Sequence, residues 1–89
     1  MIQARICVMP KASILDPQGQ TILHALGNLG FAAAHACRMG KFITLDFAGV
    51  DQAEVEREVA QICRRLLVNP NTESWSAEYR VLPDPGDGA

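Results

Sequence analysis

The chain has 89 residues, a net charge of −2 at pH 7, 20% charged residues and no basic run. This length predicts one domain with a small core, and the charge argues against a surface for nucleic acid or for an acidic membrane. The first residues lack a charged leader followed by an apolar run, and no apolar stretch is long enough to span a membrane. We therefore expect a cytoplasmic protein.

Cysteine usage gives no sign of a disulfide framework or a zinc site. The three cysteines, Cys7, Cys37 and Cys63, are widely spaced and form no Cys-x-x-Cys pair. His35 and Cys37 could supply two metal ligands, but no second pair of Cys or His follows at a useful spacing. We expect reduced thiols and no bound metal.

The first elements in the chain are a strand and a helix. Small and branched apolar residues occupy every second position over residues 2–8, namely Ile2, Ala4, Ile6 and Val8. This alternation predicts a strand with one buried face. A helix is predicted from the Asp16 cap to about residue 29, because Asp16 can accept from free N–H groups and the Pro17 that follows loses no hydrogen bond there. Gly30 can end the helix in the left-handed conformation.

Gly19 is unusual in the first turn of this helix, where it costs about 1 kcal/mol relative to Ala. We interpret it either as a tolerated local weakness or as a point where backbone or a partner chain approaches closely.

The middle of the chain predicts a β-hairpin. We expect a strand over residues 34–39, although its Ala-rich composition suits a helix better. Gly40 and Lys41 would form a type II′ turn. Residues 42–47 alternate and predict the second strand of the hairpin.

A second helix and a last strand complete the pattern. Asp51 caps the second helix, with Glu54 at the capping-box spacing, and Asn69-Pro70 ends it. Apolar residues recur on one face of this helix. Residues 75–81 alternate and predict the last strand.

This order of elements predicts an α+β fold, the ferredoxin-like split βαβ arrangement (βαββαβ), in which two helices cover one face of an antiparallel sheet. We expect a single domain over residues 1–82 and a disordered C-terminal tail over residues 83–89. The other face of the sheet would be partly apolar and would support self-association. The residues expected there are Arg5, Cys7, Met9, Phe42, Thr44 and Arg80.

The motifs of catalysis are absent from the sequence. There is no Gly-rich phosphate loop, and no local motif suggests a Ser-His-Asp or Cys-His arrangement. Capping explains Asp16, and His24 has no nucleophile or acid nearby in sequence. We predict no catalytic residue and place His24 at the surface or in an interface.

Five short motifs together resemble the small PurS-type subunit of phosphoribosylformylglycinamidine (FGAM) synthase, over nearly the whole chain. Their order and spacing carry the resemblance. The motifs are Leu15-Asp16-Pro17-Gln18-Gly19, His24-Ala25-Leu26, Leu29-Gly30-Phe31, Arg38-Met39-Gly40-Lys41-Phe42 and Cys63-Arg64-Arg65-Leu66-Leu67-Val68-Asn69-Pro70.

The resemblance implies a non-catalytic subunit that bridges a glutaminase subunit and a large synthetase subunit in de novo purine biosynthesis. It implies that ATP and Mg²⁺ are used by the large subunit and that this chain binds no cofactor. It also implies a homodimer or homotetramer. The partner contacts we expect are Asp16, Pro17, Gln18, Gly19, His24, Arg38, Gly40 and Lys41.

Three other functions share this fold plan. An acylphosphatase-like enzyme would need an anion-binding loop that residues 10–13 do not resemble, and an RNA-binding module would need aromatic residues on its central strands, where only Phe42 could serve. An ACT-like small-molecule-binding regulatory domain stays open, because such sites form between chains and leave little trace in the sequence.

Overall fold

The computed structural model describes residues 1–83 of the chain. The elements in order are β1 (Ile2–Pro10), α1 (Pro17–Asn28), β2 (Lys41–Phe47), α2 (Gln52–Ile62), the π-helical turn η1 (Cys63–Leu67) and β3 (Glu73–Val81). The tail expected over residues 83–89 falls, beyond Pro83, outside the described residues. No helix in the described part is long and apolar enough to cross a membrane.

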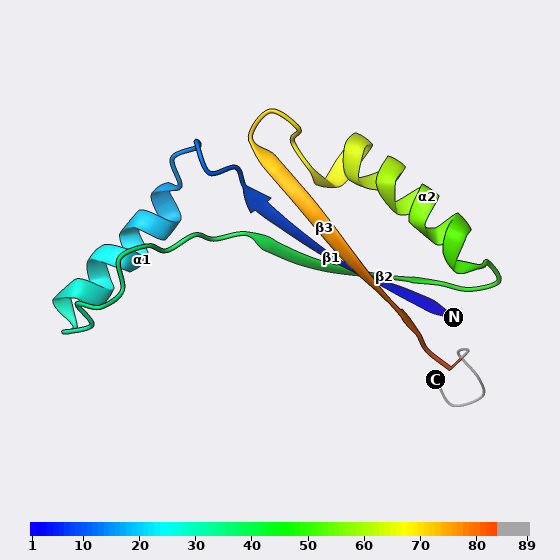
Figure 1. Cartoon of the computed structure of the whole chain (residues 1–89), viewed down its shortest axis with the longest axis horizontal. Coiled ribbons are helices and arrows are strands. Elements are labelled where there is room, and N and C mark those ends of the chain that lie inside the picture. Colours follow the sequence, from blue (N-terminus) through cyan, green and yellow to red (C-terminus); the bar gives the residue numbers. More distant parts are fainter. Residues whose placement is uncertain (84–89) are drawn as a thin grey trace.

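The three strands form one antiparallel sheet in the order β2-β1-β3, with β1 in the centre (Figure 1). The register pairs Ile6 with Ile43 on one side and with Ala77 on the other. Apolar residues at alternate positions of β1 therefore share one face of the sheet with apolar residues of both neighbouring strands.

The core lies between this face and α2. The valines Val55 and Val59 of α2 are fully buried, as are Ile6 and Val8 of β1. Helix α2 begins where Asp51 Oδ1 accepts from Glu54 N at 2.9 Å, as its sequence predicts. Its last turn is wider than an α-helix, and Cys63 in that turn is also buried.

The expected fold class, an α+β ferredoxin-like arrangement with an antiparallel sheet, is confirmed, but the strand predicted over residues 34–39 is wrong. This segment has no strand structure, and β2 pairs with β1 instead. Gly40 also lacks the positive φ that a type II′ turn requires, since Gly30 and Gly49 are the positive-φ glycines of the described chain. Small alanine side chains give this segment little to bury in a sheet.

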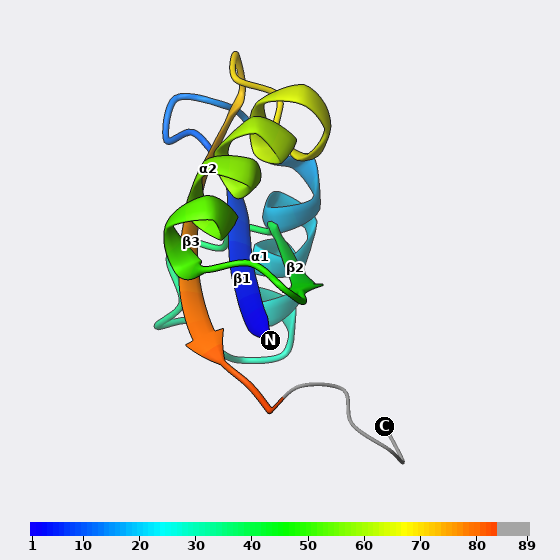
Figure 2. The ribbon, with the colours of Figure 1, turned by 90° about the vertical axis from the view of Figure 1, so that its right-hand side faces the viewer.

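The placement of α1 also differs from the expectation. Both helices were expected on one face of the sheet, but α1 extends beyond the end of the sheet while α2 packs on it (Figure 1). Figure 2 shows the sheet with α2 lying over it. The radius of gyration is 17.2 Å, whereas a compact chain of this length has about 12 Å. The molecule is thus elongated, with extents of 50 × 33 × 16 Å.

We expect Ile6→Ala to lower the free energy of unfolding by about 2–5 kcal/mol, because the side chain is fully buried in the centre of the sheet. Leu66→Ala is the control, since Leu66 is 79% exposed and its truncation should change stability by less than about 0.5 kcal/mol. Urea unfolding followed by circular dichroism measures both. Equal losses in the two variants would contradict this placement of the core.

Candidate functional site

The two connections between α1 and the sheet, residues 11–16 and 35–40, are held together by one carboxylate. Asp16 Oδ1 accepts from Gly19 N at 3.0 Å and so caps α1. Asp16 Oδ2 accepts from Met39 N at 2.7 Å, across the gap between the connections. We call Asp16, Gly19, Arg38 and Gly40 the joint, because they set where α1 lies relative to the sheet.

Arg38 also links the same two connections, by hydrogen bonds. Its Nη2 donates to the carbonyl oxygens of Pro10, at 2.8 Å, and Lys11, at 2.6 Å. Both acceptors lie at the end of β1, where the chain leaves the sheet. A guanidinium can serve two acceptors at once because its donors are arranged in a rigid fork.

The two glycines of the joint sit where backbone segments touch. A Cβ at Gly19 would overlap the carbonyl oxygen of Cys37, and one at Gly40 would overlap the carbonyl oxygen of Val8. Gly19 is also the buried residue of α1. Of the two interpretations of Gly19 from the sequence, the close approach of backbone is therefore the one that the structure supports.

The joint lowers the pKa of the Asp16 carboxyl below its usual value. The largest cause is the hydrogen bond from Met39 N–H, followed by that from Gly19 N–H, and the positive charge of Arg38 adds to them. Asp16 is therefore ionised at neutral pH, which strengthens both hydrogen bonds.

Helix α1 itself presents an uncharged and partly apolar surface. It contains no Asp, Glu, Lys or Arg, and apart from Gly19 none of its residues is buried. Leu15, Leu29 and Phe31, which flank the helix, are 73%, 72% and 60% exposed. Surface helices of monomers normally carry charges on their solvent side, so this surface is typical of one that a partner covers.

The second uncovered surface is the face of the sheet opposite α2, which we call the open face. The register of the strands places all six residues predicted for self-association there: Arg5, Cys7, Met9, Phe42, Thr44 and Arg80. The Arg5 guanidinium lies 5.0 Å from the centre of the Phe42 ring, within the range of a cation–π interaction. Their role in self-association stays a prediction.

The remaining predicted partner contacts lie on or near α1 and at the start of β2. Pro17, Gln18 and His24 are exposed on α1. Lys41 begins β2, and its Nζ is 3.8 Å from Glu73 Oε2 of β3. The structure therefore brings Asp16, Gly19, Arg38 and Gly40 together and leaves His24 outside the joint.

A groove between α2, η1 and β3 was not foreseen from the sequence. Trp75 and Arg64 line it, and the alternation of β3 and the helical pattern of α2 gave no sign that they would meet. Among the described residues, no group of three or more His, Cys, Asp or Glu side chains could hold a metal ion.

The fold and motifs have counterparts among known proteins. A family model described as "PurS: Phosphoribosylformylglycinamidine (FGAM) synthase" matches residues 3–81. The chain belongs to the PurS family. It is 41% identical over 76 residues to the phosphoribosylformylglycinamidine synthase subunit PurS of Mycobacterium leprae, covering 85% of this chain and 92% of that one.

Solved structures of PurS proteins share the fold. The structure of Bacillus subtilis PurS matches with a TM-score of 0.82 and 30% identity, covering 91% of this chain and all of that one. A chain in the structure of PurLQS from Thermotoga maritima matches with a TM-score of 0.79 and 25% identity, covering 90% and 99% of the two chains. The expected resemblance to the PurS family is confirmed.

We expect Gly19→Ala to destabilise α1, because the new methyl group would overlap Cys37 O and crowd the Asp16 carboxylate. Gly27→Ala is the matched control in the same helix. A Cβ at Gly27 meets nothing within 4 Å, so this change should stabilise the helix by about 0.5–1 kcal/mol. Amide hydrogen exchange of α1 measures both, with faster exchange expected in the first variant and slower in the second. The same response from both variants would argue against a close approach at Gly19.

The joint should weaken in acid. Because the folded-state pKa of Asp16 lies below 3.8, its ionised contacts stabilise the fold above pH 3.8 and are lost as the pH falls through the lowered pKa. Following the amide shifts of Met39 and Gly19 in an NMR titration should give a midpoint below 3.8. In Asp16→Asn this step should disappear, since the amide group does not titrate. A midpoint above 3.8 at both amides would refute the ionised bridge.

Proposed function

We propose that this chain is the small, non-catalytic subunit of FGAM synthase. In that role it bridges the glutaminase subunit and the large synthetase subunit during ATP- and glutamine-dependent conversion of formylglycinamide ribonucleotide to the amidine, in de novo purine biosynthesis. Its membership of the PurS family, matched over residues 3–81, carries this proposal. A match to a chain in the structure of PurLQS from Thermotoga maritima adds support for a place in a complex.

The shape of the chain supports a bridging role. Helix α1 and the open face lie at different places on an elongated molecule, so they can contact different chains (Figure 1). Each surface has exposed apolar groups, such as Leu29 on the α1 side and Phe42 on the open face. A scaffold of this kind can hold two active sites in a fixed relation without contributing a reacting group.

The benefit of such a bridge is physical. Ammonia released by a glutaminase is diluted into water unless the second active site is held nearby. Fixing the two sites relative to each other replaces an encounter in solution by a transfer at high local concentration. The bridge thereby raises the rate of the glutamine-dependent reaction, and the chemistry stays with the partner subunits.

The remaining features of the proposed complex follow from the same role. ATP and Mg²⁺ act in the large subunit, and this chain binds no cofactor. The open face joins copies of the chain into a homodimer or homotetramer, and the joint and α1 contact the partner subunits. We place the complex in the cytoplasm. An ACT-like regulatory domain, the alternative from the sequence, has no support in the comparisons.

The proposal predicts that glutamine-dependent formation of the amidine requires this chain. Mixing the glutaminase and synthetase subunits with and without it, and measuring product with glutamine as the nitrogen source, tests this. Without the chain the rate should fall to background, whereas the rate with added ammonium salt should stay the same, because ammonia then reaches the synthetase from solution. Unchanged glutamine-dependent activity without this chain would overturn the proposed function.

A further inference from the structure

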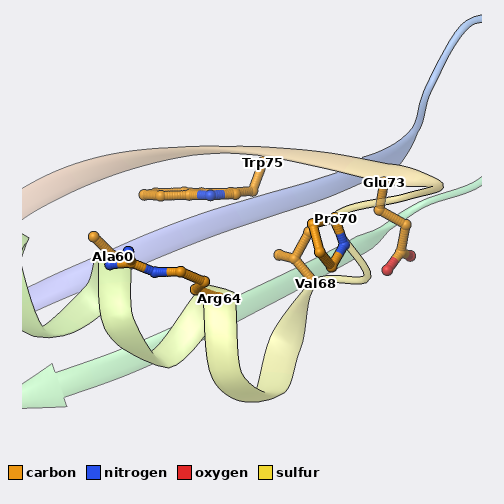
Figure 3. Close-up of a pocket in the computed structure, with 6 residues that line it drawn as sticks. All are labelled: Ala60, Arg64, Val68, Pro70, Glu73 and Trp75. Atoms are coloured by element: carbon orange, nitrogen blue, oxygen red, sulfur yellow. The ribbon is translucent and has the colours of Figure 1, made fainter.

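The groove between the end of α2 and the start of β3 encloses about 330 Å³. The Trp75 side chain forms one wall and is 39% exposed, and Arg64 lies across from it (Figure 3). The rest of the lining is mostly apolar. It consists of Ala60, Val68, Pro70 and the side chain of Glu73.

The wide turn η1 makes this surface. Its residues Cys63 and, just beyond it, Val68 point into the core and are buried, and Val68 N donates to Cys63 O at 2.9 Å. Arg64, Arg65 and Leu66 between them are exposed, Leu66 to 79%, whereas Leu67 is half-buried against the core. π-helical turns are rare overall, and those that do occur are often found at functional sites. This turn falls in the Cys63-to-Pro70 motif, which the proposed bridging role leaves unexplained.

Two arginines on this turn make no ion pair within the described chain, although Glu58 lines the same hollow as Arg65. Within residues 1–83, neither Arg64 nor Arg65 makes a hydrogen bond or an ion pair. Arg64 also lines a second hollow together with Arg65 and Gln61, and Arg65 lines a further hollow of about 410 Å³ beside Leu66. Arg64 is thus the arginine of the groove, and Arg65 lies beside it on the same turn.

The acidic residue of the groove does not balance these charges. Glu73 Oε1 accepts from Asn69 N at 2.8 Å, and Glu73 Oε2 faces the Lys41 ammonium at 3.8 Å. The carboxylate is thus already engaged by other groups. A ligand that brings its own carboxylate would meet the Arg64 guanidinium in the groove, with Arg65 beside it. A guanidinium binds a carboxylate strongly because it can donate two parallel hydrogen bonds.

We propose that this groove binds an extended segment of one of the partner subunits, a segment that carries a carboxylate next to an apolar side chain. The apolar side chain packs between Trp75 and Val68, and the carboxylate pairs with Arg64, while Arg65 beside the groove adds positive charge. Tryptophan and arginine are the residues most enriched where protein interfaces gain their binding energy. The identity of the partner rests on the proposed function.

The position of the groove favours a partner subunit over a second copy of this chain. Trp75 pairs in register with Val8, on the α2 side of the sheet. The open face, which we assign to self-association, is on the other side. Both surfaces can therefore be occupied at the same time.

Trp75 gives a direct signal for this test because it is the only tryptophan of the chain. The chain is labelled with 5-fluorotryptophan and mixed with the unlabelled glutaminase and synthetase subunits, and its single fluorine resonance is followed by NMR. We expect the resonance to move when the complex forms. The double variant Arg64→Gln/Arg65→Gln should bind the partner subunits at least about ten-fold more weakly.

The matched control is Arg57→Gln. Arg57 is exposed on α2, two turns before Arg64 of η1, and lines none of the three hollows. Its replacement should leave binding unchanged. The double variant Arg64→Lys/Arg65→Lys, which keeps the charge, should retain part of the affinity that the glutamine double variant loses. Circular dichroism of each variant verifies that it is folded.

Three results would overturn the proposal in distinguishable ways. If the complex forms but the resonance stays in place and the glutamine variant binds normally, the groove is not the contact and the bridging role stands. If the resonance moves with the concentration of this chain alone, a second copy fills the groove. If the wild-type chain binds neither subunit, the proposed function fails together with the groove.

Discussion

The bridge that the Asp16 carboxylate makes between two chain segments is the interaction on which the shape of this molecule depends. One oxygen caps α1 through Gly19, and the other accepts from Met39 on the returning segment. Arg38 adds hydrogen bonds from the returning segment to the end of β1, and Gly19 lies against the backbone of Cys37. The direction in which α1 leaves the sheet is thus set by a few directional polar contacts and two close backbone approaches, whereas the sheet and α2 are held by an apolar core.

The sequence correctly predicted those features of the fold that depend on residues close together in the chain. The Asp16 and Asp51 caps, the Gly30 stop and the alternation of β1 each act within a few residues, and all appear in the structure. The strand predicted over residues 34–39 was wrong because strand pairing depends on contacts between residues far apart in the sequence. This segment forms no strand, and β2, which the hairpin prediction had paired with it, pairs with β1 instead.

The candidate sites divide in the same way. A period of two was enough to place Arg5 and Arg80 on one face, because register fixes the face of every residue in a strand. The sequence also singled out Asp16 and Gly19. It could not show that Met39 and Cys37 would contact them, because these contacts are made by a backbone N–H and a backbone C=O, which every such residue has whatever its side chain. The groove needed Trp75 and Arg64 from two elements that only tertiary packing brings together.

Helix α1 has 12 residues and no core of its own. Helices of this length are only marginally stable alone in water. In the proposed complex, a partner that covers α1 would raise its stability by mass action, and more so as the concentration of that partner rises. A copy of the chain without a partner would then expose to proteases a helix that has no core of its own. Under the proposed function, the lifetime of the chain would follow the supply of the proteins it joins.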